Sequence, residues 1–387
     1  MEYVMCNNDH IAIIDVLVPA YNAERTILEA LTSIQTQTIT DIRIIVVNDG
    51  STDRTIDIVR SVAASDTRIL VIDQPNGGIV AARNRLIDLS TAPYIAMHDA
   101  DDISFPDRLD RQLSFLASNP DCVAVSGNGW HIDDHGRRSG GHSTFGGDVR
   151  PDPWAMPAVE PYLPQTFVMM RRDAVIAIGG YRERTNAEDT DLYWRLLSIG
   201  RLHNLVDIIG EIRMGNSSAS SAAAANGRIS AISSQLAAIS RQRSLEGKPD
   251  VSIPAPTYRK LNGASTISEM VTLLSAYLTR DETAYLQHST AAKLLELASY
   301  RPYLLTIDDC SSIHAALAPV RKASSSRDRM LLVYRQAHVL QKLLTNRRWK
   351  EARALHASPL VYTSLLPALA SRQVKALMQR VRPDLGG

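Results

Sequence analysis

The sequence has few cysteines and no apolar run long enough to cross a bilayer. Its three cysteines, Cys6, Cys122 and Cys310, are odd in number and far apart. They form neither a disulfide framework nor a zinc-binding set, and they suit a reducing compartment. No segment has the roughly 20 consecutive apolar residues of a transmembrane helix, and the first residues lack the basic start and apolar stretch of a signal peptide. We therefore expect a cytoplasmic protein.

An excess of charge of one sign is also missing. The 42 Lys and Arg residues are balanced by 41 Asp and Glu residues, which leaves a formal net charge of +1. This balance argues against a dedicated nucleic-acid binder.

No G-x-G-x-x-G follows the first predicted strand and no G-x-x-x-x-G-K-[ST] is present, which counts against NAD- and ATP-binding folds. With 387 residues, 45% of them hydrophobic, the chain is long enough for a sizeable core and a second unit.

The first half of the chain alternates apolar strands with helices. The predicted strands are 11–18, 42–47, 69–72 and 94–97, and the helices between them include 26–35 and 79–89. Short links between such elements predict an α/β fold with a largely parallel sheet that is covered on both faces. Ligands of such sheets bind at the carboxyl ends of the strands. The polar residues at 19–22, 49, 76 and 99–102 all fall there.

Three carboxylates stand in four positions directly after one of these strands. Asp99, Asp101 and Asp102 follow the predicted strand 94–97. Like charges so close together repel one another unless a cation lies among them. Mg²⁺ and Mn²⁺ prefer oxygen ligands and bind phosphates readily. The acids therefore indicate a site for a metal and a diphosphate. The alternative for an isolated Asp-Xaa-Asp is a solvated acidic turn that caps the next helix.

Three further residues suit a nucleotide. Asp49 ends a buried strand, where its carboxylate could accept from a ring imide N–H or form an ordinary turn. Tyr21 offers a ring that either stacks on a base or packs against the protein. Arg83 lies one turn into the helix after Gly77-Gly78, whose free backbone N–H groups suit a phosphate; the alternative is a surface arginine. Together these residues describe a nucleotide-diphosphate site that relies on a metal.

Four motifs, taken in order, make the chain resemble the family 2 glycosyltransferases of GT-A fold. They are Val-Pro-Ala-Tyr-Asn at 18–22, Val-Asn-Asp-Gly-Ser-Thr-Asp at 47–53, Asn-Gly-Gly and Ala-Ala-Arg-Asn within 76–84, and Met-His-Asp-Ala-Asp-Asp at 97–102. The resemblance runs from about residue 13 to residue 214. It implies transfer of a sugar from a nucleotide donor, usually a UDP-sugar, with inversion at the anomeric carbon and with Mg²⁺ or Mn²⁺ as helper.

The resemblance also implies roles for individual residues. It assigns nucleotide-sugar binding to Pro19, Tyr21, Asn22, Asp49, Asn76, Arg83, Asp99 and Arg213. Among these, Pro19, Tyr21 and Asp49 would hold the base and ribose, while Asn76 and Arg83 would contact the base or the diphosphate. Asp99 and Asp101 form the Asp-Xaa-Asp (DXD) pair, with Asp101 as the direct metal ligand. Asp102 either supports this pair or caps the helix that starts near Pro106.

A second acidic motif, Glu188-Asp189, precedes an apolar helix predicted at 192–199. It is similar to the family's Glu-Asp motif, which implies that Asp189 is the catalytic base and that Glu188 orients it or contacts the acceptor. A carboxylate in the first turn of a helix is kept ionised by the helix dipole and can accept a proton. Without the motifs upstream, plain helix capping by acidic residues would be the reading to prefer.

The chain departs from the family pattern in two places. Residues 163–168 contain no His, and Gly215 stands where the family's closing loop has a His. The motifs therefore support donor binding more strongly than the closing of this loop over the donor. Arg213 and Ser218 are still expected to reach the diphosphate. In the family arrangement Trp130, His131 and Trp154 lie on the acceptor side; packing in the core is the alternative for the tryptophans.

The character of the chain changes after residue 215. We expect a glycosyltransferase domain at 1–215, a Ser/Ala/Pro-rich linker or lid region at 216–256 and a helical C-terminal region at 257–387. The predicted helices of the last region are 267–278, 283–297, 328–345 and 349–355. Basic residues cluster around Trp349, and they suit peripheral docking to an anionic membrane. The alternative is a helical subdomain that packs on the catalytic domain or on another subunit.

The sequence thus predicts an inverting, metal-dependent hexosyl- or N-acetylhexosaminyltransferase. The resemblance places it in bacterial exopolysaccharide, capsule or lipopolysaccharide synthesis, with a lipid-linked or oligosaccharide acceptor and no nucleic-acid partner. We expect it in the cytoplasm or at the inner face of the cell membrane. Two alternatives are a retaining transferase on the same fold and a scaffold that binds nucleotide sugars without catalysis.

Overall fold

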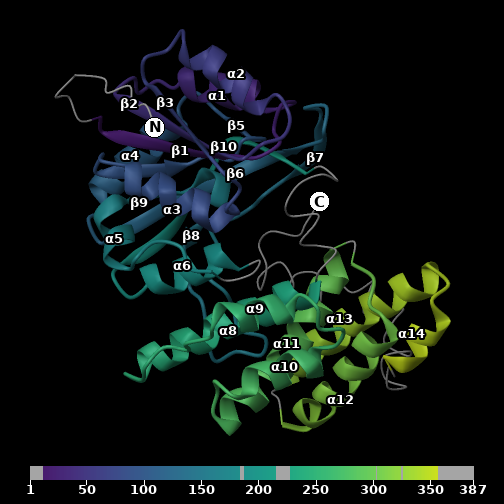
Figure 1. Ribbon diagram of the computed structural model, residues 1–387. Helices are drawn as coiled ribbons and strands as arrows, with labels where there is room; N and C mark the ends of the chain where they lie inside the picture. The colour runs from purple at the N-terminus through teal and green to yellow at the C-terminus, as the bar shows by residue number, and fades with distance from the viewer. Residues whose placement is uncertain (1–11, 184–186, 215–226, 302, 324–325, 356–387) are drawn as a thin grey trace. The chain divides into compact units, whose positions relative to one another are not determined.

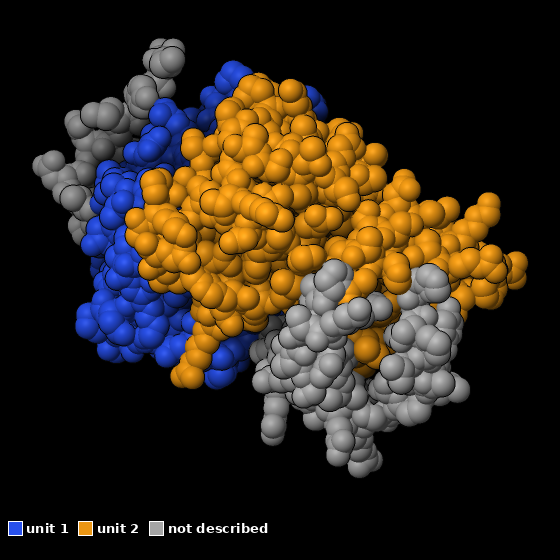
Figure 2. Space-filling model, turned by 90° about the horizontal axis from the view of Figure 1, so that it is seen from below, with its two compact units in different colours: residues 1–149, 163–181, 195–214 blue, residues 150–162, 182–194, 215–387 orange. Residues whose placement is uncertain are grey.

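The structure is a computed structural model that describes residues 12–183, 187–214, 227–301, 303–323 and 326–355. The chain divides into two compact units, which Figure 2 colours separately. Unit 1 comprises residues 1–149, 163–181 and 195–214, and unit 2 comprises residues 150–162, 182–194 and 215–387. This division differs from the predicted regions 1–215, 216–256 and 257–387, since two segments of the first half group with the C-terminal residues.

Unit 1 is built on a ten-stranded mixed sheet (Figure 1). Its parallel part consists of β1 (Ile14–Ala20), β2 (Ile42–Asp49), β3 (Ile69–Gln74) and β4 (Tyr94–Met97). The sheet continues from β4 through β9 (Met169–Arg171), β6 (Cys122–Ile132), β10 (Arg201–Arg213) and β5 (Ile103–Ser104). The short strands β7 (Arg138–His142) and β8 (Gly147–Asp148) pair with β6 and β10. The predicted α/β class and its four leading strands are confirmed.

Helices cover both faces of the parallel part. The helices α1 (Ile27–Gln35) and α2 (Thr55–Ala63) lie on one side of the sheet and α3 (Ile79–Leu89) lies on the other (Figure 1). Every residue of β1 is buried, and so is nearly every residue of β2. Strands buried on both faces carry continuous apolar runs instead of alternating ones, which is why β1 and β2 are visible in the sequence.

The strand order brings the polar strand ends to one edge. The chain runs outward from β1 through β2 to β3 and then returns to place β4 on the other side of β1. Leu17 pairs with Met97 and Ala20 pairs with Asn48, so the carboxyl ends of these three neighbouring strands lie together. The order reverses between β1 and β4, and in open α/β sheets this switch point is where ligands bind.

Unit 2 is mainly helical and has its own apolar core. Its helices include α8 (Gly227–Leu245), α9 (Ala255–Leu261), α10 (Ile267–Ser275), α11 (Arg280–Tyr300), α12 (Ile307–Ala323), α13 (Ser326–Thr345) and α14 (Trp349–Ala354). The helical C-terminal region is therefore confirmed. Within the described residues, no helix combines the length and apolarity needed to cross a membrane. Docking to an anionic membrane is untested and stays a prediction.

The expected linker or lid region at 216–256 is wrong for residues 227–245. These residues form α8, and most of them are buried, including Ser233, Ser234 and Gln235. The mixture of Ser, Ala and Ile resembles a low-complexity linker because its apolar residues follow no single stripe. A helix that is buried on most of its surface shows no such stripe. Residues 215–226, with the predicted Ser218 contact, lie outside the described part of the chain.

A buried ion pair fixes the beginning of the parallel sheet. Asp15 on β1 is fully buried and accepts from Nε and Nη2 of Arg43 on β2, each at 2.8 Å. It also accepts from the backbone N–H groups of Thr91 at 2.6 Å and Ala92 at 2.9 Å, just before β4. One carboxylate therefore ties together the three strands whose opposite ends carry the candidate site.

We expect Asp15→Ala to destabilise unit 1 by about 3 kcal/mol, because the backbone N–H groups of Thr91 and Ala92 lose their acceptor and Arg43 loses its partner. Asp88→Ala is the matched control, since Asp88 is exposed at the end of α3, and it should change the stability by less than about 0.5 kcal/mol. Urea unfolding followed by circular dichroism measures both. Equal stabilities of the two variants would contradict this prediction.

Candidate active site

The loops that follow β1 and β2 are hydrogen-bonded to each other. The N–H of Asn22 donates to Oγ of Ser51 at 3.0 Å, and the N–H of Thr52 donates to Oδ1 of Asn22 at 2.8 Å. Asn22 has a φ of 48°, a left-handed conformation that asparagine tolerates better than most residues. Its side chain thus joins the two loops. The neighbouring Tyr21 is 53% exposed, which leaves its ring open, whereas Pro19 is a buried residue of β1.

Asp49 receives three hydrogen bonds from the end of β3 and the loop after it. Its Oδ1 accepts from the N–H of Gly77 at 2.9 Å and from Nε2 of Gln74 at 2.8 Å, and its Oδ2 accepts from the N–H of Gly78 at 2.9 Å. The expectation that the N–H groups of Gly77 and Gly78 are free for a phosphate is therefore wrong: the loop folds over the carboxylate. A carboxylate has about four acceptor positions, so Asp49 can take one more donor.

A close backbone approach fixes this arrangement. Gly50 has a φ of 69°, and a Cβ atom there would lie 2.6 Å from the backbone nitrogen of Asn76. Nδ2 of Asn76 in turn donates to the carbonyl oxygen of Asp49 at 3.0 Å. A residue with a side chain at position 50 would push the loop that holds Asn76 away. The Asn-Asp-Gly motif therefore has a structural reason for its glycine.

Arg83 is a buried residue that pairs with the acidic loop. Its Nη2 lies 3.6 Å from Oδ1 of Asp99, and its guanidinium lies over the ring of Tyr181 at 5.4 Å from the ring centre. Arg83 is only 6% exposed, so the alternative of a surface arginine is wrong. The side chain of Asp99 is 32% exposed. The structure thus joins Arg83 of α3 to the first acid after β4.

The other two acids, Asp101 and Asp102, have raised pKa values. Burial and the charge of Asp99 raise the pKa of Asp101 to about 6. Asp102 is buried, and burial together with the two neighbouring acids raises its pKa well above the usual value. Its Oδ1 accepts from the N–H of Arg213 at 2.7 Å. Asp102 therefore supports the loop. The next helix, α4 (Arg108–Ser118), is preceded by Asp107 at its N-cap position. The alternative that Asp102 caps this helix is therefore wrong.

Two supporting residues, Thr166 and Arg108, escape the sequence analysis, and a third, His98, lies within the motif at 97–102. Oγ1 of Thr166 accepts from the N–H of Asp99 at 3.1 Å and also bonds the carboxyl of Asp102. Arg108 is fully buried and donates from Nη2 to the carbonyl oxygen of Met97 at 2.6 Å. His98 is buried too, which lowers its pKa to about 3, and Nδ1 donates to the carbonyl oxygen of Asp99 at 2.8 Å. No local pattern marks Thr166 or Arg108, because each contacts the loop through the fold.

Arg213, predicted to contact a diphosphate, is held among protein groups. Its Nε donates to the carbonyl oxygen of Asp101 at 2.9 Å, and Nη1 donates to the carbonyl oxygen of Asp133 at 2.9 Å. Its Nη2 lies 2.8 Å from Oε2 of Glu29. The side chain is only 6% exposed. Arg213 therefore connects the end of β10 to the acidic loop and to α1. These contacts indicate a structural role for Arg213.

The acidic pair fits a metal ion that is shared with a substrate. Within the described residues, no group of three or more His, Cys, Asp or Glu residues is arranged to hold a metal. Asp99 and Asp101 alone supply carboxylate oxygens, and their charges repel each other. Mg²⁺ is commonly held by one or two carboxylates together with substrate phosphates. The donor set is therefore suited to a cation that arrives with a diphosphate and unsuited to a fully protein-bound one.

The second acidic motif begins a helix. Glu188 and Asp189 stand in the first turn of α6 (Glu188–Leu196), four residues earlier than the helix predicted at 192–199. Oδ1 of Asp189 accepts from the N–H of Thr190 at 2.6 Å, and its side chain is partly exposed. A third acid of this turn, Asp191, is only 1% exposed. The motif lies at the positive end of a helix dipole, as the sequence predicts.

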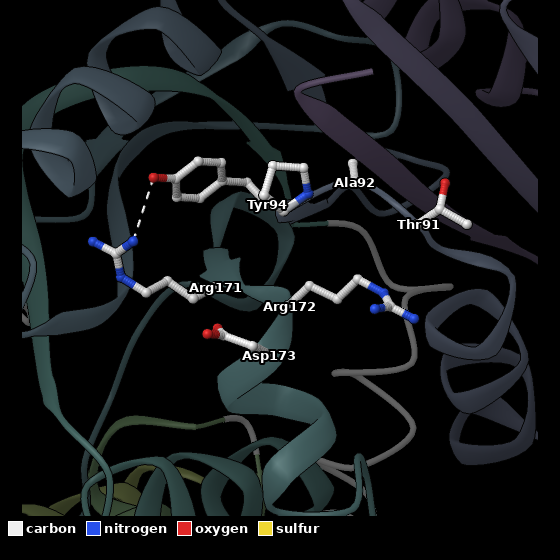
Figure 3. Close-up of a pocket in the computed structure, with 7 residues that line it drawn as sticks. Thr91, Ala92, Tyr94, Arg171, Arg172 and Asp173 are labelled. Atoms are coloured by element: carbon white, nitrogen blue, oxygen red, sulfur yellow. Dashed lines mark hydrogen bonds between the residues drawn. The ribbon is translucent and has the colours of Figure 1, made fainter. Parts of the chain in front are cut away.

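A pocket of unit 1 lies at the opposite end of β4 from the acidic loop (Figure 3). It has a volume of about 360 Å³ and is lined by Thr91, Ala92, Pro93, Tyr94, Arg171, Arg172 and Asp173. Nη1 of Arg171 donates to the hydroxyl of Tyr94 at 3.3 Å, and Nε of Arg172 donates to Oγ of Ser90 at 3.0 Å. Since ligands of such sheets bind at the carboxyl ends of strands, this pocket is not the candidate active site.

The chain is similar to known glycosyltransferases. Residues 15–179 match the model of glycosyl transferase family 2. The protein EpsE of Bacillus subtilis, whose name assigns it to the glycosyltransferases, is 33% identical over 209 residues, which are 52% of this chain and 72% of EpsE. The amylovoran biosynthesis glycosyltransferase AmsE of Erwinia amylovora is 26% identical over 205 residues, which are 52% of this chain and 76% of AmsE. Among solved structures, the mannosyltransferase PcManGT from Pyrobaculum calidifontis in complex with GDP-Man and Mn²⁺ has 18% identity and a TM-score of 0.49, with coverage of 92% and 88% of the two chains.

We expect Gly50→Ala to cost about 2 kcal/mol more stability than Gly136→Ala. Both glycines have a positive φ, but a Cβ at Gly136 would have no atom within 4 Å, whereas one at Gly50 would clash with the backbone of Asn76. The difference in unfolding free energy between the two variants therefore measures the effect of the close contact with Asn76, because the strain of a positive φ is common to both. Equal losses in the two variants would show that the loops after β2 and β3 do not depend on this contact.

Proposed function

Because the chain belongs to glycosyl transferase family 2 and is a glycosyltransferase, we propose that it is an inverting, metal-dependent enzyme that uses a UDP-sugar. Its acceptor would be a lipid-linked or free saccharide in bacterial polysaccharide synthesis, in keeping with the name of AmsE. One observation carries the proposal: Asp49 ends β2, while Tyr21 follows β1 and the Asp99–Asp101 pair follows β4, and these three strands are neighbours at the switch point of the sheet.

The loops after β1 and β2 would bind the nucleoside. Asp49 keeps one acceptor position beside its three hydrogen bonds, and a uracil imide N–H is a suitable donor for it. The exposed ring of Tyr21 follows the strand between β2 and β4 and offers a face for stacking. The loops themselves are fixed by Asn22 and Gly50, so that the nucleoside would meet a preformed surface.

The residues around β4 would bind the diphosphate. Asp99 and Asp101 would hold Mg²⁺ or Mn²⁺, which when bound supplies positive charge for the phosphate oxygens. Arg83 adds a second positive charge close to Asp99. Since the bond to the sugar breaks with both electrons going to the diphosphate, positive charge fixed at this place would stabilise the leaving group in the transition state.

Asp189 would act as the base. The acceptor hydroxyl loses its proton to the carboxylate of Asp189 while its oxygen forms a bond to the anomeric carbon. The bond from that carbon to the diphosphate oxygen breaks, and UDP leaves from the opposite face, which inverts the anomeric configuration. The first-turn position on α6 favours the ionised carboxylate that this step needs.

We expect Asp101→Asn and Asp99→Asn to lower sugar transfer by about 100-fold or more, because each removes a ligand of the cation and the charge that holds it. Asp88→Asn, on the exposed end of α3, should leave transfer unchanged. Transfer is measured as UDP release from a panel of UDP-sugars, and calorimetry with UDP, with and without Mn²⁺, measures nucleotide binding. The proposal fails if EDTA leaves UDP binding and transfer of the unaltered chain intact.

We expect Asp189→Asn to lower transfer by about 10²–10⁴-fold while UDP and Mn²⁺ binding stay unchanged, since the base takes no part in donor binding. Glu183→Gln is the matched control, because Glu183 is an exposed acid close to α6, and its activity should be normal. Proton NMR of the product should show a β-linked sugar made from an α-linked donor. Retention of the α configuration would favour the retaining alternative instead.

A further inference from the structure

The pocket at the amino end of β4 has no part in the proposed transfer (Figure 3). The acidic loop follows the carboxyl end of the same strand. The volume of the pocket, about 360 Å³, is that of a site for a small molecule. Its lining combines apolar surface from Ala92 and Pro93 with the charged side chains of Arg171, Arg172 and Asp173. An apolar wall with a few polar groups is typical of small-molecule sites.

The side chain of Arg172 is fixed in a way that leaves the end of its guanidinium to a ligand. Its Nε donates to Oγ of Ser90 at 3.0 Å, and Ser90 is only 1% exposed. In the described part of the chain, no protein group accepts a hydrogen bond from Nη1 or Nη2 of Arg172. The residue is partly buried at the pocket wall. A guanidinium with two nitrogens available can pair with two oxygens of one phosphate or carboxylate.

The neighbouring Arg171 is held by the protein but keeps its charge. Its Nε donates to the carbonyl oxygen of Cys122 at 3.0 Å, and its Nη2 donates to the carbonyl oxygen of Leu116 at 2.7 Å. Its Nη1 donates to the hydroxyl of Tyr94 at 3.3 Å. None of these acceptors is charged, so Arg171 contributes a positive charge to the pocket wall. Figure 3 shows that the side chains of Arg171 and Arg172 point to opposite sides.

Two hydroxyl groups of the lining add further donors. The hydroxyl of Thr91 accepts from Nη2 of Arg43 at 3.0 Å, and the hydroxyl of Tyr94 accepts from Nη1 of Arg171. In both bonds the oxygen is the acceptor, so the proton of each hydroxyl can be donated to a ligand. Arg43 itself is neutralised by the buried Asp15. The pocket therefore suits a ligand that is rich in oxygen acceptors.

Among the lining residues Asp173 alone is acidic, and its charge opposes an anion. Its Oδ1 accepts from the N–H of Ala174 at 2.7 Å, and its side chain is exposed. In Figure 3 its carboxylate points away from the guanidinium of Arg172. Water and salt screen an exposed charge more than a partly buried one. Since two arginines stand against this one aspartate, the lining carries a net charge of +1, which favours an anion over a cation.

We propose that this pocket binds a small anionic molecule whose phosphate or carboxylate group pairs with Nη1 and Nη2 of Arg172. The remainder of the ligand would lie against Pro93 and Tyr94. Ser90 would be a positioning residue, because its bond to Nε sets the direction of the guanidinium. The inference is independent of the proposed function, since it uses neither the donor site nor Asp189.

The first experiment titrates the ¹⁵N-labelled full chain with inorganic phosphate, glucose 6-phosphate, glucuronate and uncharged glucose, and follows the Nε–H signals of the arginines by NMR. The signal that is lost in Arg172→Lys is that of Arg172. It should shift and saturate with a phosphate or a carboxylate, which identifies the preferred group, and it should not shift with glucose. The signal of Arg60, an exposed arginine of α2, is the internal control and should not saturate.

The second experiment measures the Kd of the preferred anion from the backbone amide signals of Thr91 and Tyr94. Arg172→Ala should raise this Kd at least about tenfold, because a charge-assisted pair is lost. Asp173→Asn should lower it about twofold, because a like charge leaves the rim. Arg60→Ala removes the same charge from an exposed part of α2 and should leave the Kd unchanged. Effects of opposite sign at two adjacent residues distinguish a ligand contact from a loss of folding.

A further variant guards against a change in the pocket wall, because Arg172→Ala also removes the bond to Ser90. Tyr94→Phe keeps the aromatic ring but removes one hydroxyl donor, and it should raise the Kd about threefold. Circular dichroism shows that each variant is folded.

Three results would overturn the inference. The first is an equal response of the Arg172 and Arg60 signals to the anions, or a response of the Arg172 signal to glucose. The second is unchanged affinity in Arg172→Ala. The third is weaker binding in Asp173→Asn, which would show that the ligand presents a positive charge to the pocket.

Discussion

The repulsion among the acids that follow β4 is the constraint on which the site depends. Asp99, Asp101 and Asp102 stand within four positions, and burial of the last two makes their charges harder to accommodate, as their raised pKa values indicate. The fold surrounds them with arginines from three elements: Arg83 of α3, Arg108 of α4 and Arg213 of β10. A cation that is shared with a diphosphate is the further partner that we propose for Asp99 and Asp101.

The sheet topology turns this local constraint into a site. Because the strand order reverses between β1 and β4, the acidic loop lies at the same edge of the sheet as the loops after β1 and β2. Those two loops are hydrogen-bonded to each other, the loop after β3 is hydrogen-bonded to Asp49, and Asp15 fixes the other end of the same strands. The first unit therefore carries the groups proposed for the nucleotide, while the second unit carries the acidic turn of α6.

The sequence predicts well what depends on neighbouring residues and poorly what depends on distant ones. The strands β1 to β4, the helix Ile79–Leu89 and the acidic loop are visible as local apolar runs and motifs. Thr166 and Arg108 are not, because they reach the acidic loop only after the chain has folded. The glycines 77 and 78 carry a typical phosphate-binding pattern, yet a long-range contact with Asp49 uses their N–H groups. The sequence predicts a linker where helix α8 forms, for a related reason. This helix is buried on most sides, so it lacks the single apolar stripe that marks an ordinary surface helix.

The account is tested most directly by a crystal structure of the chain with UDP and Mn²⁺, with data collected at the manganese absorption edge. We predict an anomalous peak within coordination distance of carboxylate oxygens from Asp99 or Asp101 and of oxygens from both phosphates. UDP bound at the ends of β1, β2 and β4 without a manganese peak, and with both carboxylates directed to solvent, would contradict the central claim.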